Sequence, residues 1–232
     1  MNDAPFRTHV ASPFYRLFGR WLQILCLAMG MLPGAAQAAT THILAFGDSL
    51  TAGPGLSAGD TMPVQLQREL VARGHDVQVI NAGVSGDTTA MGLARLDYAL
   101  SAGPVEIVVL ALGANDMLNG MPPAEARANL EKMIEAFQAK GVTVILAAMV
   151  SSNNWGEAYR QEFDSIYPAL AGKYHVTMVP FFMEGVWGDP AMMIGDGVHP
   201  NAAGARRIAK KIAPYVEKVL AAEGARKETR AR

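Results

Sequence analysis

Five short apolar segments, each followed by a helical pattern, constrain the fold of this chain more than any other feature. The segments predicted as strands lie near residues 42–46, 77–82, 105–112, 142–150 and 176–180. The helical patterns lie near residues 61–73, 88–101, 123–139, 157–173 and 201–222. Strands that are apolar throughout indicate a parallel sheet covered by helices on both faces. The sequence therefore predicts an α/β protein, a three-layer α/β/α sandwich with a five-stranded parallel sheet.

Ser49 directly follows the first apolar segment, so we expect it on the turn that leaves the carboxyl end of a strand. Ligands of open α/β sheets bind at that edge. Asp196 and His199 follow late in the chain and supply an acid and a base. A serine hydroxyl becomes a good nucleophile when an imidazole accepts its proton and a carboxylate holds the imidazole. The order serine, aspartate, histidine predicts nucleophilic catalysis by these three residues.

Two other predicted strands end in candidate hydrogen-bond donors. The second ends in Asn81-Ala-Gly83 and the third in Gly113-Ala-Asn115-Asp116, and both ends belong to the same sheet edge as Ser49. Acyl transfer places negative charge on a carbonyl oxygen, which preorganised N–H groups stabilise. We therefore predict an oxyanion hole made of the backbone N–H groups of Ser49 and Gly83 and the side-chain amide of Asn115.

Several ordered sequence blocks resemble one known family. They are Gly47-Asp-Ser-Leu-Thr-Ala-Gly53, Val84-Ser-Gly-Asp-Thr-Thr89, Gly92-Leu-Ala-Arg-Leu96, Pro180-Phe-Phe-Met-Glu184 and Asp196-Gly-Val-His-Pro-Asn201. With these blocks the chain resembles the GDSL, or SGNH, hydrolase family over nearly all of its length after residue 40. Within that family it is similar to the bacterial periplasmic branch of thioesterase I, arylesterase and lysophospholipase enzymes.

The resemblance implies a role for each candidate residue. Ser49 is the implied nucleophile, Asp196 and His199 complete the triad, and Gly83 and Asn115 help to bind the oxyanion. It also implies the flavodoxin-like strand order 2-1-3-4-5. The implied activity is that of a serine esterase that hydrolyses aryl or acyl carboxylic esters, and by extension acyl thioesters or lysophospholipids, through an acyl-serine intermediate without a cofactor.

Two other functions stay open at this point. The same blocks serve carbohydrate esterases that remove acetyl groups, and a secreted binding module keeps the fold after losing turnover. Taken alone, Ser49 also fits a second interpretation, in which its side chain only caps the helix that follows. One departure from the family pattern is Ala114, where relatives often have a second glycine, and this puts the local loop geometry in question.

Large apolar residues near the strand ends are candidates for contacts with a small-molecule ester or thioester. Methionine and aromatic side chains serve equally well in a core and in a pocket, so both interpretations stay open for each residue. The candidates are Met117, Leu118, Trp155, Trp187 and Met193.

The amino-terminal segment is typical of a secretory signal peptide. Three arginines precede the apolar run Trp21–Leu32, and Ala36-Gln-Ala38 then provides small residues for cleavage. A helix needs about 20 apolar residues to span a bilayer, and this run is shorter. We therefore expect no integral membrane span in the mature chain. We predict a signal peptide at 1–38, cleavage after Ala38, and a periplasmic or secreted protein.

Composition excludes several partners. The formal net charge is −1, whereas a nucleic-acid partner requires a basic face, so we predict no nucleic-acid binding. Cys26, the single cysteine, lies in the signal peptide, and no paired histidine spacing occurs, so we predict no metal site. The glycine-rich segment Gly47–Gly59 lacks the Gly-Lys-Ser/Thr ending of a phosphate loop, so we expect no nucleotide-binding role for it.

The mature chain is long enough for one domain, which we place at 39–224. We predict a disordered tail at 225–232, because it is charged and has no apolar residue larger than alanine. Pro214 is expected to kink or interrupt the last helix. Asp48 is expected to brace the turn at Ser49, and Asp87 and Arg95 to pair and hold helices.

Overall fold

Parallel pairing joins the five strands in the order β2-β1-β3-β4-β5 in the computed structural model, which describes residues 40–230. The strands are β1 (Thr41–Gly47), β2 (Val77–Gly83), β3 (Ile107–Ala111), β4 (Thr143–Ala147) and β5 (Thr177–Val179). The register aligns Gly47 with Gly83 and with Ala111. The predicted fold and strand order are confirmed. The predicted signal peptide at 1–38 lies outside the described residues.

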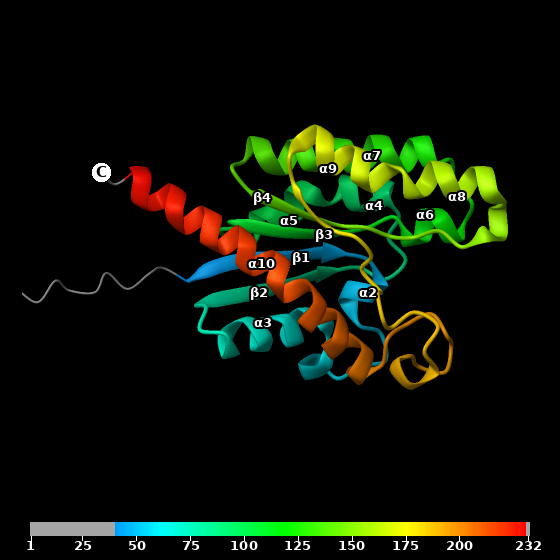
Figure 1. The fold of residues 1–232 in the computed structure, drawn as a ribbon, viewed down its shortest axis with the longest axis horizontal. Coiled ribbons are helices and arrows are strands. Elements are labelled where there is room, and N and C mark those ends of the chain that lie inside the picture. The colour runs from blue at the N-terminus through cyan, green and yellow to red at the C-terminus, as the bar shows by residue number, and fades with distance from the viewer. Residues whose placement is uncertain (1–39, 231–232) are drawn as a thin grey trace, which may run out of the picture. The chain divides into compact units, whose positions relative to one another are not determined.

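Helices cover both faces of the sheet (Figure 1). On one face, α3 (Met62–Ala72) packs against α10 (Ala202–Arg230). The other face carries α4 (Thr89–Ala94), α5 (Leu96–Ser101), α7 (Pro123–Ala139), α8 (Glu157–Asp164) and α9 (Ile166–Tyr174). Shorter elements follow the strand ends: α2 (Ser49–Ala52), η1 (Ala58–Asp60), α6 (Ala114–Leu118), η2 (Asn153–Trp155) and η3 (Pro190–Met192). Among the described residues, no helix has the length and apolar character to cross a membrane.

The core lies on both sides of β1 and β3. Ile43–Phe46 and Ile107–Leu112 are almost completely buried, as expected for strands with helices on both faces. The Phe46 ring meets the Phe137 ring of α7 edge-on, with the ring centroids 5.7 Å apart. This packing fixes the carboxyl end of β1, where Ser49 begins the next element.

Two predicted helices are each divided in the structure. The helix expected at 88–101 is broken at Arg95, which lies between α4 and α5. The Arg95 side chain turns inward, donating to Asp87 at 2.5 Å and to the Gly47 carbonyl at 2.9 Å. The helix expected at 157–173 is broken at Ser165, between α8 and α9. The Asp87–Arg95 pair itself is confirmed.

The last helix differs from its prediction in two respects. It continues through Pro214 without the interruption that was one of the two expected effects of the proline, and the neighbouring Ile212, Ala213 and Val216 are buried. It also continues to Arg230, where a disordered tail from 225 was predicted. Alanine, arginine, lysine and glutamate are good helix formers, and an ion pair between Arg226 and Glu223 (2.9 Å) adds local support.

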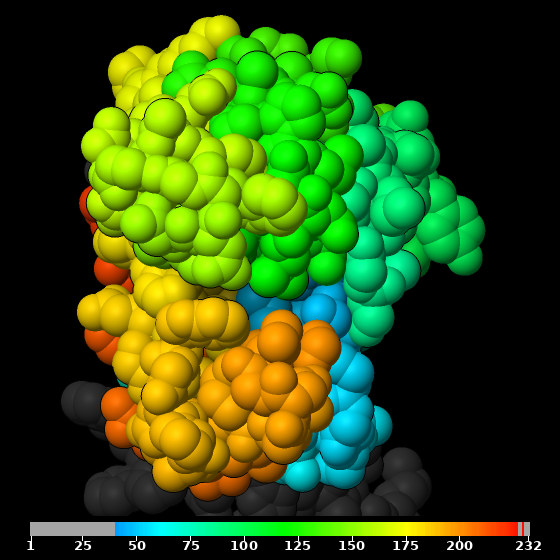
Figure 2. All heavy atoms as spheres, turned by 90° about the vertical axis from the view of Figure 1, so that its right-hand side faces the viewer, coloured from blue at the N-terminus to red at the C-terminus, as the bar shows by residue number. Residues whose placement is uncertain are grey.

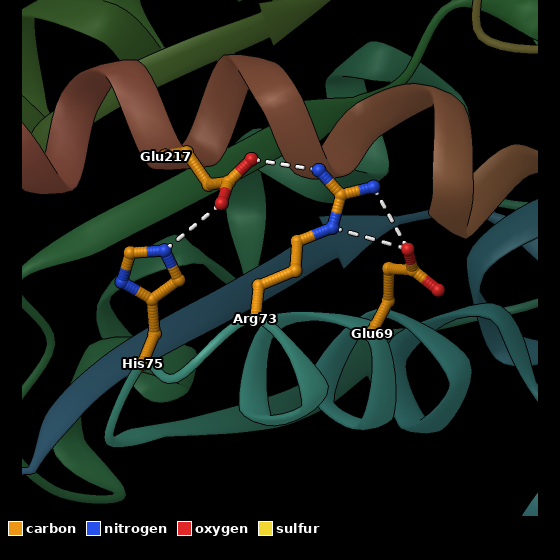
Figure 3. Close-up of polar contacts among 4 residues, drawn as sticks. All are labelled: Glu69, Arg73, His75 and Glu217. Carbon is orange, nitrogen blue, oxygen red and sulfur yellow. Dashed lines mark hydrogen bonds and ion pairs between the residues drawn. The ribbon is translucent and has the colours of Figure 1, made fainter.

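A polar cluster joins α3 to α10 on the surface of one helical layer (Figure 3). Arg73 donates to Glu69 and to Glu217 of α10, both at 2.8 Å. The His75 Nε2 atom lies 3.0 Å from the second oxygen of Glu217. The hydrogen bonds from His75 and Arg73 hold the pKa of the Glu217 carboxyl below its usual range. This cluster therefore connects two helices and lies outside the carboxyl edge of the sheet.

Candidate active site

β1 delivers Ser49 to the carboxyl edge of the sheet through a tight turn. Gly47 has no room for a side chain, because a Cβ atom there would lie 2.2 Å from Thr51 Oγ1 and 2.7 Å from the Ala111 carbonyl. Asp48 caps α2, and its Oδ1 atom accepts a hydrogen bond from the Leu50 N–H at 2.9 Å. Asp48 thus braces the turn as predicted, and Ser49 becomes the first residue of α2.

The loop before α10 holds Asp196 and His199 in one rigid turn. Asp196 Oδ1 accepts hydrogen bonds from the N–H groups of Val198 (2.8 Å) and His199 (3.0 Å). The other oxygen, Oδ2, lies 2.6 Å from His199 Nδ1. The bond with the His199 side chain, together with the two backbone N–H groups, lowers the pKa of Asp196 to about 2. A charged carboxylate therefore faces the imidazole at all pH values of physiological interest.

His199 connects this loop to Ser49, the first residue of α2, although 150 residues separate the two in the sequence. The His199 Nε2 atom lies 2.9 Å from Ser49 Oγ. The structure therefore brings the predicted serine, histidine and aspartate into one hydrogen-bonded line. Asn201, one turn further on, accepts from the Ala203 and Gly204 N–H groups and caps α10.

Asn115 lies on α6, the short helix that follows β3. Asn115 and Ser49 line the same pocket. The Asn115 Nδ2 atom donates to the Asp87 carbonyl at 2.9 Å. This bond uses one of the two amide hydrogens and fixes the orientation of the side chain. The second hydrogen of this amide has no acceptor among residues 40–230.

Gly83 does not present the free N–H group that the sequence predicted. Its N–H donates to Asn81 Oδ1 at 3.0 Å. The next N–H along the strand, that of Val84, donates to the Gly47 carbonyl of β1, so the Gly83 N–H points away from β1. Position 83 requires glycine for a different reason, because a Cβ atom would lie 2.3 Å from the Ala52 nitrogen of α2.

Gly86 carries an N–H group that the prediction did not consider. Among residues 40–230, its N–H has no hydrogen-bond acceptor, and neither has the N–H of Ser49. Gly86 has a φ of 87°, a conformation that favours glycine, and it precedes Asp87, whose carbonyl holds Asn115. Gly86 lies in the Val84–Thr89 block, one of the sequence blocks that carry the family resemblance, and this block could have identified it.

Two buried carboxyl groups, those of Asp116 and Asp48, lie at the carboxyl edge of the sheet. Asp116 accepts hydrogen bonds from the Thr89 N–H (2.8 Å) and the Thr89 hydroxyl (2.6 Å), which join α6 to α4. Asp48 is completely buried, and its Oδ2 atom has no partner among the described residues. Burial raises the pKa of Asp48 to about 7, in spite of the opposing Leu50 N–H bond. Sequence reasoning expected Asp48 to brace the turn, but did not predict that its carboxyl group is buried or that its pKa is raised.

An apolar pocket opens beside Ser49. Figure 2 shows this face of the molecule, where the segment around α2 (blue) lies between green atoms above and orange atoms below. Of the predicted contact residues, Met117, Leu118 and Trp187 line the pocket. Sequence reasoning missed several other lining residues, which are Leu50, Ala114, Met149, Val150, Phe181, Met183 and Val198.

Trp155 and Met193 are not among the lining residues. Met193 is buried in the core, where it pairs with Pro200 in an isolated bridge. Trp155 packs outside the pocket wall, and its Nε1 atom donates to the Met117 carbonyl at 2.8 Å. Within residues 40–230 no group of three or more histidine, cysteine, aspartate or glutamate side chains is placed to hold a metal ion.

Comparison with known proteins places this site in a family. The model of the GDSL-like lipase/acylhydrolase family matches residues 45–207. The chain is 39% identical over 195 residues to esterase TesA of Pseudomonas aeruginosa, an alignment that covers 84% of this chain and 96% of that protein. It is 38% identical over 199 residues to an arylesterase of Vibrio mimicus, covering 86% and 100% of the two chains.

A solved structure agrees with these relatives. The crystal structure of AlinE4, an SGNH-hydrolase family esterase, superposes with a TM-score of 0.66 at 44% identity and covers 78% of this chain and 97% of that chain. The matched segment, 45–207, includes Ser49, Asn115, Asp196 and His199. The chain therefore belongs to the GDSL-like lipase/acylhydrolase family.

Proposed function

We propose that this protein is a serine esterase that hydrolyses carboxylic esters with apolar acyl or aryl groups through an acyl-serine intermediate. One observation carries the proposal: Ser49 Oγ lies 2.9 Å from His199 Nε2, and Asp196 lies 2.6 Å from the other ring nitrogen. This line satisfies the geometric requirement for a nucleophile, its base and the group that orients the base. The esterase relatives support the same activity.

The reaction begins with attack of Ser49 Oγ on the ester carbonyl carbon, while His199 accepts the hydroxyl proton at Nε2. Asp196 stabilises the imidazolium that forms. His199 then returns the proton to the leaving alcohol, or to a thiol in the case of a thioester. Water repeats the cycle on the acyl-serine and releases the carboxylic acid.

The developing oxyanion is stabilised by three donors in this proposal. They are the N–H of Ser49, the second amide hydrogen of Asn115, and the N–H of Gly86 in place of that of Gly83. The unpaired N–H groups of Ser49 and Gly86 within the described residues support this assignment, as does the Asn115–Asp87 bond next to Gly86. Preorganised donors of this kind need no reorganisation when charge develops.

The pocket lining supports an apolar substrate. Ser49 and Asn115 are the two lining residues with polar side chains, and no charged residue lines the pocket. Such a wall offers few hydrogen bonds to a sugar ring and a large contact area to an acyl chain or an aromatic ring. Acyl thioesters and lysophospholipids are included, since both present an apolar acyl group to the nucleophile.

The proposed site of action is outside the cytoplasm. We assign residues 1–38 as a signal peptide that is removed after Ala38, on the basis of the arginines, the apolar run and the Ala36-Gln-Ala38 motif. The mature enzyme then works in the periplasm or as a secreted protein. Amino-terminal sequencing of protein recovered from the periplasm tests this assignment, with Ala39 as the expected first residue.

A substrate series tests the activity. The mature protein and Ser49→Ala are compared on p-nitrophenyl esters from acetyl to palmitoyl, on acyl-CoA thioesters and on acetylated sugars, and a fluorophosphonate probe tests labelling of Ser49. We expect hydrolysis of aryl and longer acyl esters that is absent in Ser49→Ala. Activity confined to acetylated sugars would replace the proposal with carbohydrate deacetylation, and a protein without activity or labelling would be a binding module.

A further inference from the structure

An aromatic residue recurs at every fourth position from η2 to α9. The row consists of Trp155, Tyr159, Phe163 and Tyr167. Tyr159 stacks on Phe163 with ring centroids 6.1 Å apart, and Phe163 meets Tyr167 edge-on at 5.9 Å. Tyr159 and Phe163 are four positions apart on α8 and share one face of that helix, whereas Tyr167 lies on α9 beyond the break at Ser165 and Trp155 lies on η2. Trp155 extends the spacing by one step at the solvent end.

Each polar member of the row donates a hydrogen bond to the same segment of main chain, residues 112–121. This segment leaves β3 and contains α6. The bonds are Tyr167 Oη to the Leu112 carbonyl (2.9 Å), Trp155 Nε1 to the Met117 carbonyl (2.8 Å) and Tyr159 Oη to the Met121 carbonyl (3.0 Å). The bonded residues are at least 38 positions apart in the sequence, so tertiary packing alone brings them together.

Two glycines let the row approach this backbone closely. A Cβ atom on Gly120 would lie 2.7–2.9 Å from three atoms of the Trp155 indole. A Cβ atom on Gly113 would lie 2.3 Å from Tyr167 Oη. Both glycines also have a positive φ, 62° and 117°. The indole therefore rests directly on the main chain of the loop after α6.

The braced segment forms one wall of the active-site pocket. Asn115, Met117 and Leu118 line the pocket, whereas Trp155 does not. Tyr167 is fully buried at the base of the row, but Trp155 is 52% exposed at its tip. The base of the row thus belongs to the core, and the tip contacts the part of the wall nearest to solvent.

We propose that Trp155 is a positioning residue that sets the acyl-chain preference of the enzyme by holding the wall at Met117 and Leu118. This inference rests on the proposed ester hydrolysis. Without the indole N–H, the Met117 carbonyl keeps only the bonds from the N–H groups of Asn119 and Gly120, which belong to its own segment. The wall then moves relative to Ser49, and small displacements near reacting groups have large effects on rate. A short acyl group does not extend along this wall, so the effect grows with chain length.

Trp155→Phe is the most informative variant, because it keeps a ring over Gly120 and removes the hydrogen-bond donor. Values of kcat and KM are measured for p-nitrophenyl esters from acetate to decanoate in the wild type, in Trp155→Phe and in Tyr159→Phe. In Trp155→Phe we expect KM to rise about tenfold for octanoate and about twofold for acetate, with a smaller change in kcat. Tyr98→Phe is the control, since Tyr98 lies on α5 and is 81% exposed; its chain-length profile should match that of the wild type.

A second readout does not depend on activity. Backbone N–H groups of Met117, Asn119, Gly120 and Met121 are hydrogen-bonded, so their hydrogen exchange is measurable. We expect faster exchange over 117–121 in Trp155→Phe than in the wild type or Tyr98→Phe.

The outcomes separate the two proposals. A chain-length profile of Trp155→Phe parallel to that of the wild type, or a uniform loss on all esters together with a lower Tm, overturns the positioning role. Unchanged exchange over 117–121 overturns it as well. If the wild type lacks Ser49-dependent hydrolysis, the proposed function fails, while the exchange data still decide whether Trp155 holds this segment.

Discussion

Two of the histidine–carboxylate pairs among the described residues have very different surroundings. His75 contacts Glu217 at 3.0 Å between α3 and α10, and His199 contacts Asp196 at 2.6 Å at the carboxyl edge of the sheet. The first pair shares its carboxylate with Arg73 and connects two helices (Figure 3). The second pair has Ser49 on the far side of the imidazole and an apolar pocket beside it. A histidine–carboxylate pair therefore indicates catalysis only when the sheet edge supplies a nucleophile.

The largest expected effect tests this contrast directly. His199→Ala and Ser49→Ala should each lower kcat by roughly 10⁴-fold or more, because removal of either group leaves the other without its partner. His75→Ala should leave kcat/KM of the same esters within about twofold, since its pair lies outside the active edge. Steady-state kinetics on one p-nitrophenyl ester measure all three. A large loss of activity in folded His75→Ala would contradict the comparison.

The next effect concerns the donors that distinguish the active edge. Asn115→Ala should lower kcat by about 100- to 1000-fold with little change in KM, because the amide acts on charge that develops in the transition state. Asn81→Ala releases the Gly83 N–H from its side-chain acceptor and is the matched control. If the Gly83 N–H takes no part in catalysis, kcat of Asn81→Ala should change by less than about fivefold. A loss comparable with that of Asn115→Ala would restore Gly83 to the oxyanion hole.

Asp48 sharpens the comparison through burial. Burial raises its pKa to about 7, whereas Glu217 on the surface has a lowered pKa. For Asp48 the folded-state pKa lies above the ordinary value of 3.8, so its contribution to stability is fully present below about pH 3.8 and is lost as pH rises through about 7.

Asp48→Asn should therefore gain stability over the wild type as pH rises. The expected gain between pH 5 and pH 8 is on the order of 2 kcal/mol in the free energy of unfolding. Urea unfolding of both proteins at the two pH values measures it. An equal difference at pH 5 and pH 8 would show that the Asp48 carboxyl does not titrate in this range.

The smallest effect is expected at the surface pair. Glu217→Gln removes the charge that joins Arg73 and His75 but keeps the side-chain length, and these groups are about one-third exposed. Exposed ion pairs contribute little, so the free energy of unfolding should fall only slightly, with less effect at high salt. Urea unfolding at low and high salt checks both expectations. A loss of several kcal/mol would mean that the cluster carries much of the α3–α10 packing.

The buried strands were predicted better than the division of the helices. β1 and β3 were predicted well, because strands buried on both faces have a continuous apolar sequence. The helix at 88–101 was predicted as continuous, because its division depends on the bonds of Arg95 with Asp87 and with Gly47, which lies 48 positions away. Local periodicity does not record such a partner.

The candidate site divides in the same way. Serine, aspartate and histidine were predicted from their order and from the strand ends, and they meet in the structure. Gly83 was chosen as a donor because it ends a strand, but the direction of its N–H depends on strand pairing and on Asn81. Trp155 was a candidate either for substrate contact or for packing, and in the structure it is not a lining residue but donates to the Met117 carbonyl behind the pocket wall.

The sequence by itself determined the order of strands and helices, the chemical identity of the nucleophile, base and acid, and the edge at which they meet. Those features depend on local patterns and on the rule that parallel strands end at one edge. The tertiary structure decided which N–H groups are free, which apolar residues line the pocket, and which carboxyl is buried beside Ser49. These properties depend on contacts between segments far apart in the chain, and no local pattern encodes them.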